Sequence, residues 1–294
     1  TLFNENWKFH RGDVENAQDV NYNDTTWENI NLPHDYSIDQ EFTTSGEAES
    51  GFLPGGVGWY RKSFVVPEKY KDKQLMVEFD GAYMNAEVYL NGKKLGDHPY
   101  GYTAFAFDLT DGLICDGKTE NVLVVKTNNQ IPSSRWYSGS GIYRDVTLTV
   151  TDDVHVGYNG TQIIAQDLEA NKNGTVEVDI TTTVENDSDT TKTVTVKNTL
   201  LDENGKVASN TTTSQVEIAA DSTQDIEQSV NVEKPELWSV DDANMYKMKT
   251  EIVENDEVLD TYETDYGFRY YNFDKDTGFS LNGEKMKLKG VSMH

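Results

Sequence analysis

A Gly/Ser-rich segment in the middle of the chain carries the side chains best suited to ligand binding. Residues 133–141 read Ser-Ser-Arg-Trp-Tyr-Ser-Gly-Ser-Gly and place Arg135, Trp136 and Tyr137 side by side. Aromatic rings stack on the C–H faces of sugars, and a guanidinium fork donates paired hydrogen bonds, so this combination suits a neutral carbohydrate. The same residues would also suit packing against another domain, and residue type alone leaves both interpretations open.

Patterns for catalysis or metal binding are weak. His34 lies next to Asp35, but adjacent side chains seldom converge and no nucleophile motif accompanies them, so a structural turn set by Pro33 is predicted. Arg144 and Asp145 are expected to form a buried charge pair. The five histidines never fall at metal-ligand spacing, and no C-x-x-C motif occurs. The sequence therefore predicts no catalytic residue, no metal site and no cofactor.

Composition and charge narrow the class of partner. The net charge of −26 opposes binding to nucleic acids or anionic membranes, whereas a neutral sugar is compatible with it. A hydrophobic share of 36% and an aromatic share of 11% favour a folded chain. The single Cys115 excludes an internal disulfide. The first residues show no signal-peptide pattern, and both a cytoplasmic and a secreted location stay open.

The elements that must position these residues are predicted to be mostly β-strands. Short runs rich in β-branched and aromatic residues predict strands at 75–79, 86–90, 122–126, 146–150, 175–180 and 191–196. Asn91-Gly92 predicts a hairpin turn, because both residues tolerate positive φ. No stretch of a dozen residues keeps a helical period. These signals predict an all-β chain built of sandwiches.

The chain divides at two positions, where its charge and its pattern of predicted strands change. Residues 151–267 hold 26 Asp and Glu against 7 Lys and Arg, so this part carries −19 of the total charge of −26. After Gly267, a strand and turn are expected at 279–283, followed by a last strand at 287–292 that has no sheet of its own. We therefore predict domains at 1–150 and 151–267, with a truncated third domain at 268–294.

Several motifs occur in an order known from one enzyme family. They are Leu-Pro-His-Asp-Tyr at 32–36, Gly-Trp-Tyr-Arg-Lys at 58–62, Ala-Glu-Val-Tyr-Leu-Asn-Gly at 86–92, Gly-Tyr at 101–102 with Phe-Asp-Leu-Thr at 107–110, Arg-Trp-Tyr-Ser-Gly-Ser-Gly-Ile-Tyr-Arg-Asp at 135–145, Pro-Glu-Leu-Trp at 235–238, Tyr-Gly-Phe-Arg at 266–269, and Phe-Ser-Leu-Asn-Gly at 279–283 with Leu-Lys-Gly-Val-Ser-Met-His at 288–294. With these motifs the whole chain resembles family 2 glycoside hydrolases, and most of all bacterial β-galactosidases.

The resemblance implies a fold for each part. Residues 1–150 would form a jelly-roll sugar-binding domain, 151–267 an immunoglobulin-like sandwich, and 268–294 the start of a (β/α)₈ barrel cut off after its first strand. His294 would lie at the tip of that strand and contact the sugar, although Ser292-Met293 replaces the family's usual Asn-Arg before it. Arg135, Trp136 and Tyr137 would line the substrate pocket.

The resemblance also implies an activity. Family members retain anomeric configuration by using two glutamates, which lie on later barrel strands and are absent from this chain. The parent enzyme would hydrolyse terminal β-galactosides, and the chain alone would be inactive. The alternatives are a free-standing carbohydrate-binding module, or a parent that is a β-glucuronidase or a β-mannosidase.

Overall fold

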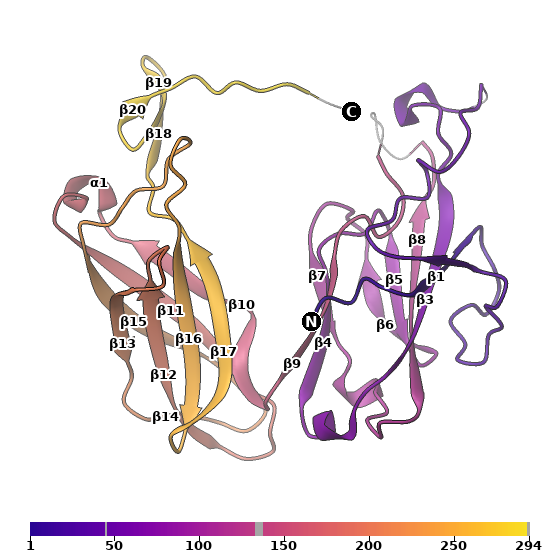
Figure 1. Ribbon diagram of the computed structural model, residues 1–294, viewed down its shortest axis with the longest axis horizontal. Helices are drawn as coiled ribbons and strands as arrows, with labels where there is room; N and C mark the ends of the chain where they lie inside the picture. The colour runs from indigo at the N-terminus through magenta and orange to yellow at the C-terminus, as the bar shows by residue number, and fades with distance from the viewer. Residues whose placement is uncertain (45, 133–137, 293–294) are drawn as a thin grey trace. The chain divides into compact units, whose positions relative to one another are not determined.

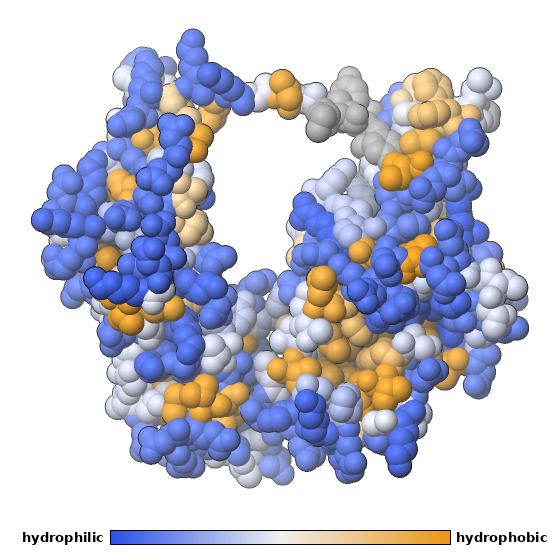
Figure 2. Space-filling view, in the orientation of Figure 1, coloured by the Kyte–Doolittle hydropathy of each residue, from blue (hydrophilic) through white to orange (hydrophobic). Residues whose placement is uncertain are grey.

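The computed structural model describes residues 1–44, 46–132 and 138–292 of the chain (Figure 1). Their regular structure is almost entirely strands, which confirms the predicted all-β class. Two compact units divide the chain, the first over Thr1–Val150 and the second over Thr151–Val291. No helix in the described part is long and apolar enough to cross a bilayer. The visible surface is mostly hydrophilic, in keeping with the charge of −26 (Figure 2).

The first unit consists of two sheets. The larger has six strands in the order β2-β1-β3-β8-β5-β6, and the smaller has three in the order β7-β4-β9. In chain order the strands are β1 (Trp7–Arg11), β2 (Glu28–Ile30), β3 (Gly56–Val65), β4 (Gln74–Phe79), β5 (Ala86–Leu90), β6 (Lys93–His98), β7 (Phe105–Asp108), β8 (Glu120–Asn129) and β9 (Val146–Thr151).

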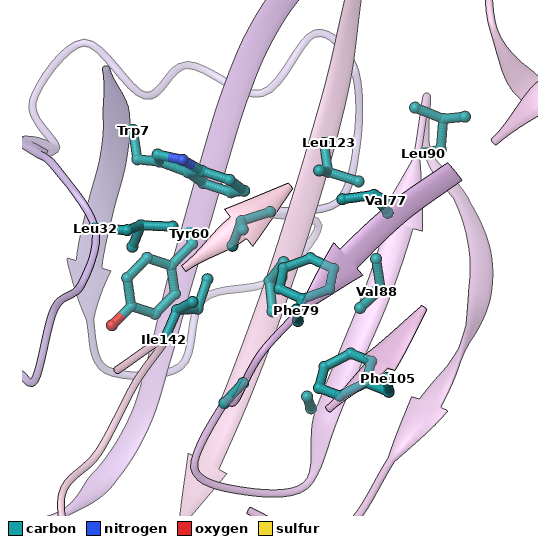
Figure 3. Close-up of a cluster of buried hydrophobic side chains, with 14 of the residues drawn as sticks. Trp7, Leu32, Tyr60, Val77, Phe79, Val88, Leu90, Phe105, Leu123 and Ile142 are labelled. Atoms are coloured by element: carbon teal, nitrogen blue, oxygen red, sulfur yellow. The ribbon is translucent and has the colours of Figure 1, made fainter. Parts of the chain in front are cut away.

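One hydrophobic core joins the facing surfaces of these sheets (Figure 3). Alternate residues of β4, namely Leu75, Val77 and Phe79, are buried, as expected for a strand with one face toward a core. Trp7 of β1 and Leu123 of β8 contribute from the larger sheet and are fully buried. Packing of side chains from both sheets into one cluster makes this unit a β-sandwich.

The predicted turn at Asn91-Gly92 joins β5 to β6. Asn91 has φ 49° and Gly92 has φ 83°, the left-handed pair that a two-residue hairpin requires. The predicted strands at 75–79, 86–90, 122–126 and 146–150 all lie within observed strands. Sequence and structure therefore agree on these four strands of the unit, β4, β5, β8 and β9.

The second unit also pairs two sheets. One holds β10 (Val154–Ala165), β11 (Thr175–Asn186) and β15 (Ser222–Glu233). The other holds β12 (Lys192–Leu201), β13 (Val207–Thr212), β14 (Val216–Ile218), β16 (Tyr246–Glu254) and β17 (Glu257–Tyr266). The short helix α1 (Leu168–Asn171) follows β10.

A buried polar layer separates two apolar clusters in this unit. Along β12, Val196 belongs to one cluster and Leu200 to the other, and Asn198 lies between them on the same face. Asn198 is fully buried, accepts a hydrogen bond from Thr250 Oγ1 at 2.5 Å and donates one to Gln228 Oε1 at 2.9 Å. These bonds stabilise a polar group that would otherwise be costly to bury.

The last residues form a small sheet of β18 (Tyr271–Asp274), β19 (Gly278–Leu281) and β20 (Glu284–Lys285). The strand and turn predicted at 279–283 are present, but the strand predicted at 287–292 is wrong. Val291 is 95% exposed, and no strand in the described part pairs with this segment. The apolar pattern alone could not form a strand, because an isolated strand gains neither ladder hydrogen bonds nor buried area.

Candidate functional site

Two sequence motifs from distant parts of the first unit run side by side. The backbone N–H of His34 donates to the carbonyl of Ile142 at 2.8 Å, and the N–H of Tyr36 donates to the carbonyl of Ser140 at 2.9 Å. The Leu-Pro-His-Asp-Tyr segment therefore flanks the residues that follow the predicted binding loop.

Asp35 fixes this arrangement through one carboxylate oxygen. Asp35 Oδ1 accepts hydrogen bonds from the backbone N–H groups of Ser37 and Ser140, both at 2.9 Å. A Cβ atom on Gly139 would lie 2.4 Å from Asp35 Oδ2, so a residue without a side chain is needed where the carboxylate approaches the backbone. Bonds to a charged acceptor are stronger than neutral ones, which makes Asp35 the main link between the two segments.

A buried network ties both ends of the predicted loop. Asn129, the last residue of β8, donates from Nδ2 to Ser140 Oγ at 2.8 Å. The hydroxyl groups of Ser140 and Ser37 are hydrogen-bonded at 2.6 Å, and Ser37 Oγ also donates to the carbonyl of Pro54 at 2.9 Å. Asn129 and Ser140 are fully buried. The residues before and after segment 133–137 are therefore held by the same satisfied network.

His34 contacts a different group from Asp35. Its Nδ1 is 2.8 Å from the hydroxyl of Tyr60, a fully buried side chain of β3. Burial raises the pKa of Tyr60 well above its usual value and lowers the pKa of His34, so both groups are neutral near pH 7. Figure 3 shows the Tyr60 hydroxyl beside Ile142, directed away from most of the apolar cluster.

Gly141 allows this contact to form. Its φ is 122°, and a Cβ atom there would lie 2.2 Å from the Tyr60 hydroxyl. The adjacent side chains of His34 and Asp35 thus have separate structural partners, which fits the predicted turn around Pro33 and not a catalytic dyad.

The predicted charge pair of Arg144 and Asp145 is wrong. Both residues are exposed. Asp145 Oδ1 accepts from Asn4 Nδ2 at 2.8 Å, whereas the Arg144 guanidinium lies over the Tyr143 ring, 5.5 Å from its centre. The two residues precede β9 (Val146–Thr151), and their side chains have different partners, so adjacency in sequence did not bring the charges together.

Sequence reasoning gave little weight to a group of tyrosines around Gly101. Tyr100 and Tyr102 are 58% and 53% exposed, and their ring centres are 5.6 Å apart. Tyr83 meets Tyr102 edge to face at 5.2 Å, and Tyr143 donates its hydroxyl to the carbonyl of Gly101 at 2.7 Å. The Gly-Tyr motif at 101–102 was the available signal. The exposed rings of Tyr100 and Tyr102 form an aromatic surface on which the apolar face of a sugar can stack.

The predicted substrate-contacting residues Arg135, Trp136, Tyr137 and His294 lie outside the residues that the structure describes. The structure thus defines the hydrogen bonds of the residues that flank 133–137, and the roles of these four side chains stay predictions.

Two family models match the two units in turn. The sugar-binding domain of glycosyl hydrolases family 2 matches residues 13–152, and a second model of glycosyl hydrolases family 2 matches residues 161–269. Together they cover most of the chain, which therefore belongs to glycosyl hydrolases family 2. This finding confirms the resemblance seen in the motifs.

Individual relatives align along the whole chain. The β-galactosidase BoGH2A of Bacteroides ovatus is 40% identical over 295 residues, covering 99% of this chain and 34% of the relative. A β-glucuronidase of Formosa agariphila is 33% identical, covering 98% of this chain and 31% of the relative. A solved family 2 member from Bacteroides cellulosilyticus superposes with a TM-score of 0.92 at 34% identity, covering 98% of this chain and 38% of that structure. The chain thus spans about a third of the length of these proteins.

Proposed function

We propose that this chain is the non-catalytic N-terminal part of a retaining glycoside hydrolase that cleaves terminal β-galactosides. In this proposal the first unit is a jelly-roll domain that presents residues 133–137 to the substrate pocket, and the second is an immunoglobulin-like support. A catalytic barrel starting at residue 268 would carry the two glutamates, and His294 would contact the sugar.

The buried network at the ends of segment 133–137 is the observation that carries this proposal. A binding loop needs fixed ends, because ordering its side chains on binding costs free energy. Asp35, Asn129 and Ser140 provide that fixation through hydrogen bonds of 2.8–2.9 Å. The segment so held contains the Arg-Trp-Tyr combination that suits sugar recognition.

A β-glucuronidase activity of the parent is the second candidate. Its support is the alignment with the Formosa agariphila β-glucuronidase along 98% of this chain. A β-galactoside is ranked first because the named β-galactosidase of Bacteroides ovatus has the higher identity, 40% against 33%.

Titration of the isolated 294-residue chain with sugars tests whether the chain is a free-standing binding module. In calorimetric titration with β-galactosides, we expect no binding tighter than millimolar, because the barrel would supply most contacts to the sugar. Tight binding that Trp136→Ala abolishes would contradict the support role and establish a binding module.

The role of Trp136 is tested in the complete enzyme. Trp136→Ala should raise KM for a nitrophenyl β-galactoside about 5- to 30-fold, since loss of one stacking ring costs about 1–2 kcal/mol. Tyr158→Ala, which removes an exposed aromatic side chain from β10 of the second unit, is the matched control and should leave KM unchanged. Equal KM values for the Trp136→Ala and control variants would remove Trp136 from the substrate pocket.

A further inference from the structure

Three side chains of types that bind metal ions, His155, Glu185 and Asp187, lie close together in the second unit, near the start of β10. Antiparallel pairing of β10 with β11 places His155 directly opposite Glu185. Asp187 follows Glu185 by two residues, just after β11 ends, and its backbone N–H donates to the carbonyl of Asp153 at 2.9 Å. Residues two apart along an extended chain share a face, so all three side chains lie on one side.

The distances within this cluster are too long for hydrogen bonds but fit a shared ion. His155 Nε2 is 3.5 Å from Glu185 Oε2, and His155 Nδ1 is 3.7 Å from Asp187 Oδ2. One ligand atom from each of the three residues lies within 4.8 Å of the others. Ligands that bind a metal at about 2.0–2.2 Å lie roughly 3–4 Å from one another, so small rotations of the carboxylates would complete the geometry.

The imidazole of His155 supplies an independent sign of a missing ligand. Its side chain is only 13% exposed, and its Nδ1 atom is shielded from solvent without a hydrogen-bond partner. A buried polar atom left unpaired costs about 1–3 kcal/mol, so native structures rarely contain one. A coordinated cation would satisfy such a nitrogen.

The backbone beside His155 leaves room for the Glu185 carboxylate. A Cβ atom on Gly157 would lie 2.5 Å from Glu185 Oε1. Gly157 and His155 share a face of β10, so the absent side chain lets Glu185 lie along the strand near the imidazole. The charge of −19 over residues 151–267 also attracts cations to this unit.

We propose that His155, Glu185 and Asp187 bind a divalent first-row transition-metal ion, of the class of Zn²⁺ and Mn²⁺. Imidazole selects such ions over Ca²⁺ and Mg²⁺, which prefer sites made only of oxygen. Water would complete the coordination, because both carboxylates are partly exposed. The ion would be structural: it would fasten the end of β11 to the start of β10. The site could not be recognised from the sequence, because Glu185 follows His155 by 30 residues and only the strand register brings the two together.

The test uses the tag-free 294-residue chain after removal of metals with EDTA. Calorimetric titration with ZnCl₂ and with MnCl₂ should show one saturable site for at least one of the two ions, and the same ion should raise the melting temperature. His155→Ala should abolish this binding, and Glu185→Gln and Asp187→Asn should each weaken it at least tenfold. His98→Ala, which removes a partly exposed histidine from the first unit, should bind as the wild type does.

Circular dichroism on each variant separates loss of ligand from loss of fold. If His155→Ala does not fold, the near-isosteric Glu185→Gln and Asp187→Asn variants decide the question. Unchanged binding in the variants that fold, or no saturable binding of either ion, would overturn the proposal. A melting temperature that does not change when either metal is added would also overturn it, because the direct contacts of the imidazole with the two carboxylates would then account for the cluster.

Discussion

Replacing Asp35 by alanine tests whether its carboxylate joins the two segments at the ends of the predicted loop. The change leaves the backbone N–H groups of Ser37 and Ser140 without their acceptor. Ser37 is 2% exposed and Ser140 is fully buried, so water reaches neither freely. An unsatisfied buried donor costs about 1–3 kcal/mol. Two such donors, partly relieved by solvent entering from the side of Asp35, give an expected loss of about 3 kcal/mol.

The Asp35→Asn variant refines the prediction. Its amide oxygen keeps both N–H groups paired but lacks the negative charge, so we expect about half the loss, roughly 1.5 kcal/mol. Asp39→Ala is the matched control. The Asp39 side chain is 65% exposed and lies 3.6 Å from His34 Nε2; because His34 is neutral near pH 7, this contact should contribute at most about 0.5 kcal/mol.

Urea unfolding followed by tryptophan fluorescence measures these differences. Trp7, Trp27 and Trp59 are buried in the first unit, so the signal reports mainly that unit. For a unit of this size, 3 kcal/mol lowers the melting temperature by roughly 6–12 °C. If Asp35→Ala stays within 0.5 kcal/mol of the wild type, the carboxylate does not hold these segments together and the argument for a fixed loop fails.

Three further substitutions test other parts of the structure. Gly141→Ala should lower the free energy of unfolding by about 3 kcal/mol or more, because φ is 122° and the new Cβ would meet the Tyr60 hydroxyl. Gly205→Ala is the control: its Cβ would enter open space, so urea unfolding should show a loss of only about 1 kcal/mol. Asn198→Ala should destabilise the second unit by about 2–4 kcal/mol in calorimetry, as it removes the centre of the buried polar layer; a loss below 1 kcal/mol would show that the layer is not needed. Hydrogen bonds from Lys249 and Lys197 lower the pKa of Glu251. The ionised carboxylate therefore stabilises the fold fully at pH values above the unfolded-state pKa of about 4.3. This stabilisation is lost as the pH falls through the pKa of the folded state. The urea midpoint of Glu251→Gln should therefore lie below that of the wild type at pH 7, and the gap should close as pH falls through the folded pKa; a gap that does not change with pH would contradict the assigned cause.

Local patterns in the sequence predicted much of the fold. The strand signals at 75–79 and 175–180 and the Asn91-Gly92 turn depend on neighbouring residues only, and the structure has these elements where they were expected. The predicted strand at 287–292 failed because strand formation needs a partner, which no local pattern can supply.

The candidate site was less predictable, because its contacts are long-range. Asp35 and Ser140 are 105 residues apart, and nothing in either motif indicates that one caps the other. His155 and Glu185 become neighbours through strand register alone. The order of the motifs predicted the family, because related chains keep the same motifs in the same order. The contacts that fix the ends of the loop, and those that bring the proposed metal ligands together, could be identified only from the three-dimensional structure.

Hydrolysis of nitrophenyl glycosides by the full-length gene product and by the 294-residue chain is the most direct test of the proposed function. The account predicts that the full-length protein cleaves the β-galactoside faster than the β-glucuronide, and that the chain alone cleaves neither. Preference for the β-glucuronide would refute the proposed substrate, and turnover by the chain alone would refute its non-catalytic role.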